Sequence, residues 1–532
     1  MLAEPTPAAL EAPGPAAPVP PPPRTGQDPD ATPNVPRPRA RADHPADRVT
    51  GYWRRLLPLL ALLALVTRLP SFRHPLWSPD EGYLAVQARM LAGGGVLYDT
   101  VVDRKPPLLP WLYEATFAVL GDSTLTGVRA LAVLAHLLTA ALLAATARDR
   151  RGDRAGRTAG VLYLLVSVGL NPEDTQAATF EVFILPFTAA AMWCAGKARW
   201  GAAGLAVAGA LLMKQTGGAV LLPVLWLLGR TPRARTGLPR LAAGLALPLL
   251  AAALLTTPSG LVFWTVTGSG SYATPTGSEL HVLLRAVANT ALLALGCLGL
   301  LPPLLRLARR TAPRTDGDLW LWLASSAVAV LTGFHFFGHY FLQLLPPLVL
   351  LATEGLHLPP RDRLTATLTT AACTCALFLA WGVLAPRPEL AHAQRLADVV
   401  RDRTAPTDRV LVWGIHPETY WFADRAPASR YLTAGLLTNY SGGRDGPRVG
   451  EAYAVAGAWP ALTAELRAHP PALIVDDSRG KPFAPERLPT LRRFLARHYE
   501  PLPDTVDGAV IYVPSPASDV PSSNPDAPSP GR

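Results

Sequence analysis

The sequence predicts a mainly α-helical, polytopic membrane protein with about eleven transmembrane helices and a small C-terminal α/β domain. Of its 532 residues, 49% are hydrophobic and only 17% are charged, and the mean hydropathy is +0.21. The apolar residues are gathered into long runs, which is typical of membrane-spanning chains. The basic residues lie in short segments between these runs, so the net charge of +10 reflects membrane topology and does not indicate nucleic-acid binding.

The chain begins with a polar tail that leads into the first apolar run. Residues 1–48 are rich in Pro, Ala, Asp and Arg and have almost no large apolar side chains, which predicts a disordered cytoplasmic tail. The transmembrane domain covers 49–385, and its first span covers about 52–69, with Arg54 and Arg55 at the entrance. We therefore expect the chain to emerge on the outer face of the membrane after this span.

The segment 71–123 is the first exterior loop, and it contains a short helix of its own. Ser78 is a favourable N-cap, Pro79 suits the first helical position, and Glu81 completes a capping-box pattern. The run 106–121 is apolar but short, and we interpret it as lying along the exterior face. If it spanned, the arginine cluster at 148–157 would face outward, against the positive-inside rule.

Ten further spans follow once the second span is placed at 124–147. This threading puts the arginine-rich segments on the cytoplasmic side and polar segments such as 171–179 and 335–339 on the exterior. The remaining nine spans are expected at about 158–170, 180–196, 200–213, 217–229, 238–256, 286–305, 318–334, 340–356 and 364–385.

Residues 386–513 are predicted to form a small extracytoplasmic α/β domain, because an odd number of spans precedes them. Short apolar runs at 410–413, 472–475 and 509–513 read as buried strands, and 459–468 and 488–498 read as helices. Residues 514–532 form a Pro/Ser/Asp-rich tail that we expect to be disordered.

Charged residues in the exterior loop are the first candidates for chemistry. Asp80 and Glu81 adjoin each other, but the capping box explains Glu81 without any function, and acids are favourable in a first helical turn. Lys105 precedes two prolines, where it can contact a phosphate or simply extend its ammonium toward water. His335 and His339 are spaced for a metal, yet their aromatic neighbours favour an interfacial belt. The pattern alone does not decide between a structural and a functional role for Asp80 or for Lys105.

The order of several motifs resembles the family 39 glycosyltransferases of the GT-C superfamily, which include protein O-mannosyltransferases and lipid A aminoarabinose transferases. Over about residues 52–480 the resemblance rests on Asp80-Glu81, Lys105-Pro-Pro-Leu-Leu-x-Trp-Leu, Thr179-Phe-Glu181, Met213-Lys-Gln-Thr216, 339–346, 408–413 and 425–431.

The resemblance implies inverting transfer of a sugar from a polyprenyl-phosphate donor to a lipid, glycan or protein acceptor, at the extracytoplasmic face of the cell membrane. It implies that Asp80 is the base or orients the acceptor, that Lys105 contacts the donor phosphate, and that Glu181 is a second acid, with Glu173 and Asp174 as rivals. The expected catalytic residues are Asp80, Glu81, Lys105 and Glu181, and the expected substrate-binding residues are Tyr83, Lys214, His339, Tyr340 and Gln343.

No cofactor is certain from the sequence. A divalent cation bridging a carboxylate and the donor phosphate remains open, and no metal ligands are assigned. The alternative function is that of a multi-pass transporter or flippase for a lipid or a sugar. Transporters often contain inverted repeats and broken helices at mid-membrane, whereas the polar residues of this chain gather at one face.

Overall fold

The computed structural model describes residues 45–232, 234–268, 279–310, 315–358, 363–440 and 448–516. Residues from Tyr52 onward form one compact unit. The predicted tails fall largely outside the described residues.

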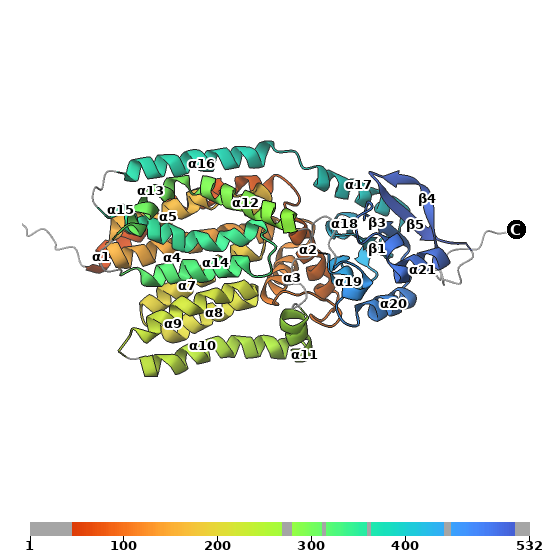
Figure 1. Cartoon of the computed structure of the whole chain (residues 1–532), viewed down its shortest axis with the longest axis horizontal. Helices are drawn as coiled ribbons and strands as arrows, with labels where there is room; N and C mark the ends of the chain where they lie inside the picture. The colour runs from red at the N-terminus through yellow and green to blue at the C-terminus, as the bar shows by residue number, and fades with distance from the viewer. Residues whose placement is uncertain are drawn as a thin grey trace, which may run out of the picture. The chain divides into compact units, whose positions relative to one another are not determined.

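A bundle of apolar helices makes up the first two thirds of this unit (Figure 1). Five helical stretches are long and apolar enough to cross a membrane: Thr50–Phe72, Thr126–Arg151, Ala234–Leu255, Glu279–Gly296 and Leu364–Arg403. Shorter apolar helices pack between them, so the polytopic, mainly helical class is confirmed, while the count of eleven spans stays a prediction. The bundle helices are α1 (Pro45–Arg68), α4 (Thr126–Arg151), α5 (Asp153–Val166), α7 (Phe180–Gly196), α8 (Trp200–Met213), α9 (Leu221–Gly229), α10 (Ala234–Leu255), α12 (Glu279–Gly296), α13 (Leu301–Ala308), α14 (Gly317–Leu331), α15 (Leu345–Leu356) and α16 (Leu364–Leu384).

Two short helices follow α1 at the end of the bundle that adjoins the C-terminal sheet (Figure 1). Helix α2 (Pro79–Ala92) begins as predicted, with the Ser78 hydroxyl accepting a hydrogen bond from the Asp80 amide at 3.3 Å. Helix α3 (Leu108–Leu120) packs against α2 and contacts α4 and α8. At about 1.5 Å per residue, its 13 residues fall well short of the roughly 30 Å hydrocarbon core.

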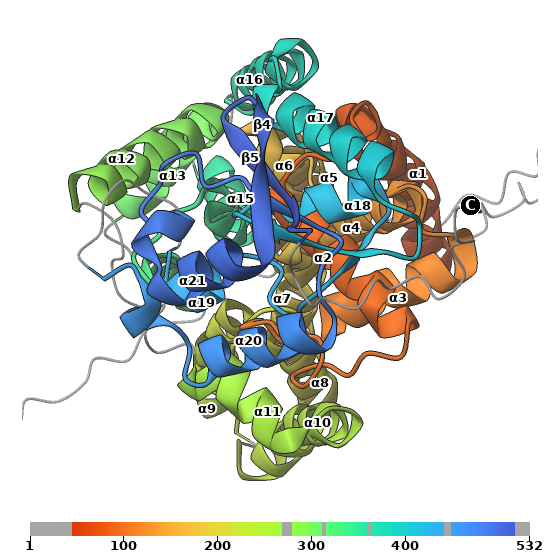
Figure 2. The ribbon, with the colours of Figure 1, turned by 90° about the vertical axis from the view of Figure 1, so that its right-hand side faces the viewer.

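The C-terminal part of the chain forms a five-stranded sheet with helices around it (Figure 2). The strand order is β2-β1-β3-β5-β4, where β1 (Arg409–Trp413) pairs in parallel with β2 (Ala426–Pro427) and β3 (Leu473–Asp476). The strands β4 (Tyr499–Val506) and β5 (Ala509–Pro514) form an antiparallel hairpin on the other side of β3. Helices α17 (Pro388–Arg403), α18 (Glu418–Ala423), α19 (Gly435–Thr438), α20 (Ala458–Ala468) and α21 (Pro489–His498) complete this part.

The buried strands β1, β3 and β5 and the helices α20 and α21 match their predicted positions closely. Strands β2 and β4 were not predicted. Strand β2 is only two residues long, and β4 contains Pro501 and Pro503, which are tolerated because β4 is an edge strand.

Candidate active site

Helix α2 holds Asp80 beside Lys105 of the following loop. The Asp80 Oδ2 lies 3.7 Å from the Lys105 Nζ, and 33% and 28% of the two side chains remain exposed. The Lys105 ammonium also lies over the Phe180 ring, 4.3 Å from its centroid. The Lys105 backbone is fixed, because its amide donates to Asp103 Oδ1 at 3.2 Å and its carbonyl accepts from the Tyr98 hydroxyl at 2.9 Å. The result is an accessible ion pair held on a rigid segment.

A second, buried ion pair lies at the ends of two bundle helices. Glu181 is in the first turn of α7, Lys214 follows the last turn of α8, and their side chains form an ion pair. The Lys214 Nζ also lies 3.9 Å from the centroid of the Tyr340 ring. The second carboxylate oxygen of Glu181 is buried and accepts no hydrogen bond from the part of the chain that the structure describes.

His339 joins this buried pair from the opposite side. Its Nδ1 lies 2.8 Å from Asp174 Oδ1, and its Nε2 lies 3.9 Å from Glu181 Oε1. The approach of Asp174 depends on Gly338, since a Cβ at that position would lie 2.1 Å from the Asp174 Oδ2. Of the two rival acids, Asp174 and not Glu173 therefore contacts His339.

The charges of these groups act on Asp80. Burial raises the pKa of Asp80, but the positive charges of Lys105, His339 and Lys214 outweigh burial and hold the pKa below its ordinary value. Asp80 is therefore ionised at neutral pH. The neighbouring Asp103 behaves in the opposite way, because burial dominates and raises its pKa. We call Asp80, Lys105, Glu181, Lys214 and His339 the polar cluster.

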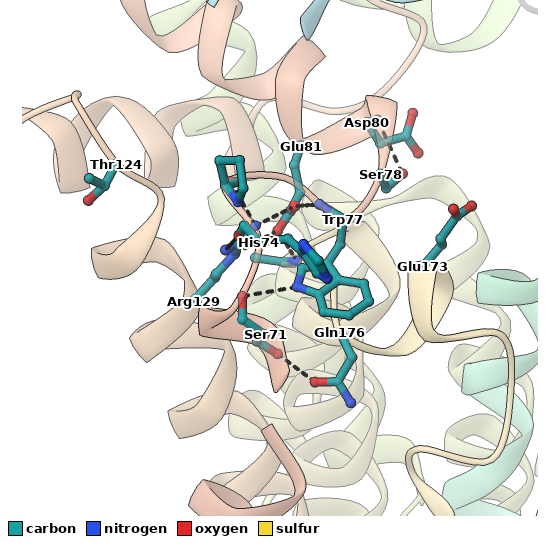
Figure 3. Close-up of polar contacts among 12 residues, drawn as sticks. Ser71, His74, Trp77, Ser78, Asp80, Glu81, Thr124, Arg129, Glu173 and Gln176 are labelled. Carbon is teal, nitrogen blue, oxygen red and sulfur yellow. Dashed lines mark hydrogen bonds and ion pairs between the residues drawn. The ribbon is translucent and has the colours of Figure 1, made fainter. Parts of the chain in front are cut away.

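Glu81 points away from Asp80, as Figure 3 shows. It is fully buried, and its Oε2 lies 2.9 Å from Nη2 of Arg129. The backbone amides of Trp77 and Ala178 donate to its two oxygens at 2.7 and 2.8 Å. In the predicted capping box Glu81 would bond the amide of Ser78; it bonds that of Trp77 instead. Glu81 thereby ties the start of α2 to α4 and to the segment before α7.

The other sequence-derived candidates use their polar groups within the protein. The Tyr83 hydroxyl donates to the Val102 carbonyl at 2.9 Å, and the Gln343 amide donates to the Tyr340 carbonyl at 3.0 Å. The rival acid Glu173 is half-exposed and pairs with Arg387 at 3.2 Å. Tyr83 and Gln343 lie next to polar-cluster residues or their contacts, whereas Glu173 faces the segment that enters the C-terminal part.

Sequence reasoning missed Arg129. It lies in α4, where an arginine inside an apolar run costs free energy unless it is paired. That anomaly was the available signal, and the partner, Glu81, lies 48 residues away in sequence. Among the described residues, no group of three or more His, Cys, Asp or Glu side chains is arranged to hold a metal ion.

Comparison with known proteins supports the architecture. Residues 104–255 match the family model of the dolichyl-phosphate-mannose-protein mannosyltransferases. A search of curated proteins gave no significant match.

Solved structures give matches over nearly the whole chain. ArnT from Cupriavidus metallidurans bound to undecaprenyl phosphate is 15% identical, with a TM-score of 0.56, and the match covers 88% of this chain and 99% of ArnT. The apo form of ArnT also has a TM-score of 0.56 at 15% identity, covering 87% of this chain and 98% of ArnT. The apo oligosaccharyltransferase of Archaeoglobus fulgidus is 15% identical, with a TM-score of 0.51, covering 89% of this chain and 76% of the other.

The resemblance found in the sequence motifs is thus confirmed at the level of the fold and, over residues 104–255, by the family model. A family model matches the segment from Arg104 into α10, and the fold matches over most of the chain. The chain is a polytopic membrane protein with the fold of the GT-C glycosyltransferases, and its residues 104–255 are similar to the dolichyl-phosphate-mannose-protein mannosyltransferases.

Proposed function

We propose that the protein is a membrane glycosyltransferase that moves a sugar from a polyprenyl-phosphate donor to an extracytoplasmic acceptor with inversion at the anomeric carbon. The observation that carries the proposal is the polar cluster, in which an accessible acid, Asp80, faces two lysines from different segments. ArnT, which has this fold, was solved with undecaprenyl phosphate. A structure of the archaeal oligosaccharyltransferase AglB, with a TM-score of 0.50, contains a dolichol-phosphate.

Asp80 and Lys105, the two members of the accessible ion pair, each have one role in the reaction. The acceptor hydroxyl attacks the anomeric carbon, its proton passes to an oxygen of Asp80, and the bond from that carbon to the donor phosphate oxygen breaks. The electron pair of the breaking bond leaves on the polyprenyl phosphate. Lys105, 3.7 Å from Asp80, neutralises the charge that develops there, and Lys214 adds to it. Because Asp80 is a weak base, it accepts the proton late, after much of the new bond has formed.

Glu181, His339 and Asp174, which are more buried than Asp80 and Lys105, act on the donor in this scheme. The Glu181–Lys214 ion pair fixes the lysine, and the unused oxygen of Glu181 can accept a hydrogen bond from a sugar hydroxyl. His339, oriented by Asp174 at 2.8 Å, can donate its other ring proton toward the same space. These residues position the donor, and correct positioning contributes as much to the rate as proton transfer does.

The test is an assay of the full chain in detergent or vesicles with a polyprenyl-phosphate sugar. Asp80→Asn and Lys105→Ala are each expected to lower transfer by about 10²- to 10⁴-fold, with unfolding temperatures close to that of the wild type. Matched controls are Asp122→Asn, an exposed acid paired with Arg89, and Lys197→Ala, a half-exposed lysine paired with Asp149. Normal transfer in both site variants would overturn the assignment, and movement of unaltered donor across vesicles would favour a transporter.

A further inference from the structure

A groove lined by leucines and arginines lies along α13 and the turn that precedes it. It has a volume of about 370 Å³ and is lined by Leu298, Leu301, Pro302, Leu305, Arg306, Arg309 and Arg363. The first six positions follow the i, i+3, i+4, i+7, i+8 and i+11 spacing of one helix face, so they form one stripe along the 3-10 turn Leu298–Leu300, α13 and its C-cap Arg309. Arg363 comes from the N-cap of α16. The stripe is apolar at one end and cationic at the other.

Helix packing gives this groove its second wall. The turn before α13 packs on α16 so closely that a Cβ on Gly299 would lie 2.7 Å from the Thr367 carbonyl oxygen. Arg363 lies one turn before Thr367 and therefore faces the cationic end of the stripe. The leucines of the groove are not covered by other helices, since 45% of Leu298 and 52% of Leu305 is exposed.

The dimensions of the stripe suit a lipid. Residues 298 to 309 span roughly 16 Å at about 1.5 Å per residue, which is close to one leaflet of a hydrocarbon core about 30 Å thick. The threading from the charge pattern puts the arginine end on the cytoplasmic side. No carboxylate lies within ion-pair distance of Arg309 or Arg363 among the described residues.

We propose that this groove binds an anionic phospholipid of the cytoplasmic leaflet. One acyl chain lies along Leu298, Leu301 and Leu305, and the phosphate is held by Arg306, Arg309 and Arg363. Guanidinium groups pair with phosphate oxygens in a bidentate manner, and a neutral phosphatidylcholine headgroup offsets that attraction with its own cation. The proposal concerns the opposite end of the bundle from the polar cluster and does not depend on the sugar-transfer reaction.

The experiment is a titration of the delipidated full chain with phosphatidylglycerol and with phosphatidylcholine, read by native mass spectrometry. The triple variant Arg306→Gln, Arg309→Gln, Arg363→Gln should bind phosphatidylglycerol about a hundredfold more weakly, at about fivefold for each arginine lost. Its binding of phosphatidylcholine should not change. The matched control removes three arginines that lie outside the groove but on the same predicted face: Arg54→Gln, Arg55→Gln and Arg230→Gln. It should change phosphatidylglycerol binding by less than about threefold.

Three results would overturn the proposal. The wild-type chain could bind both lipids equally, which needs no variant and so holds even if the triple variant fails to fold. The control could lose as much affinity as the groove variant, which would assign the effect to general surface charge. A second copy of the chain could cover the groove in a stable dimer that excludes phosphatidylglycerol.

Discussion

Charged side chains gather in two regions of this molecule, and the regions differ in how exposed their central acid is. In the C-terminal part, His392 lies 2.9 Å from Asp477 and 3.0 Å from Asp507, and Asp477 also lies 3.1 Å from Arg479. In the polar cluster, Asp80 has a single ion-pair contact among the described residues, at 3.7 Å, and stays one-third exposed.

The difference distinguishes charged groups that stabilise the fold from charged groups that can act on a substrate. Both regions are dense in titratable groups, so density alone identifies neither. A site that must receive a substrate has to keep a charged group accessible. Asp80 meets that condition, whereas His392 and Asp477 are buried against each other. Glu81, although next to Asp80 in sequence, is a group that stabilises the fold, because it is buried and paired with Arg129.

The largest effect is expected from Glu81→Gln. The change leaves the buried Arg129 without its carboxylate, which costs about 3 to 5 kcal/mol of stability. Denaturant unfolding of the purified protein should reveal this loss, while transfer per folded molecule stays within about tenfold of the wild type. A Glu81→Gln protein that is as stable as the wild type but inactive would give Glu81 a direct role and weaken the comparison.

The pH dependence of stability that arises from Asp476 tests the structural role of the C-terminal region. Burial raises the pKa of Asp476 to about 6. Between pH 4 and 6 the folded state therefore binds more protons than the unfolded state, so this group's stabilising contribution is complete below about pH 4 and is lost as the pH rises to 6. Asp476→Asn should remove that loss and stabilise the protein at pH 7 by up to about 3 kcal/mol.

The measurement for Asp476→Asn is the difference in unfolding free energy between variant and wild type across pH 4 to 8. The difference should grow up to about pH 6 and then stay constant. Transfer per folded molecule should not change. A variant that loses stability at pH 7, or one whose transfer rate falls, would contradict the structural assignment of this region.

The smallest effect is expected at the contact between the two regions. A Cβ on Gly82 would lie 2.6 Å from the Cβ of Glu418 in α18, so Gly82→Ala must displace the first turn of α2, which carries Asp80. We expect transfer to fall by about tenfold, because small displacements of catalytic groups are costly. Gly93→Ala is the matched control, since its Cβ would meet only ordinary contacts at 3.4 Å.

A second measurement distinguishes displacement from simple loss of stability. Because a Cβ on Gly82 would also lie 2.8 Å from the Glu418 Cα, a glycine at 418 would not relieve the clash, so transfer per folded molecule should stay low in Gly82→Ala even where its unfolding temperature is close to that of the wild type. If Gly82→Ala transfers sugar at the wild-type rate, the first turn of α2 is not positioned by α18.

Most of the architecture could be predicted from the sequence, because long apolar runs and helix signals are local. Helix α7 was predicted at its observed limits, and α2 starts after the predicted Ser78 cap. The pairings within the site could not be predicted in this way. The bond between Glu81 and Arg129 and the contact between His339 and Asp174 join residues distant in sequence, so they depend on tertiary packing. The edge strand β4 was hidden by its prolines.

Arg387 joins the last bundle helix to the first loop of the chain. Its guanidinium pairs with Glu173, bonds the carbonyl of Trp77 and stacks over the indole ring of Trp77 at 4.6 Å. A chimera that replaced everything after α16 with the corresponding part of a relative would have to carry an arginine at this junction. Without it, the loop preceding α2 would lose the hydrogen bond and the ring contact that Arg387 makes with Trp77.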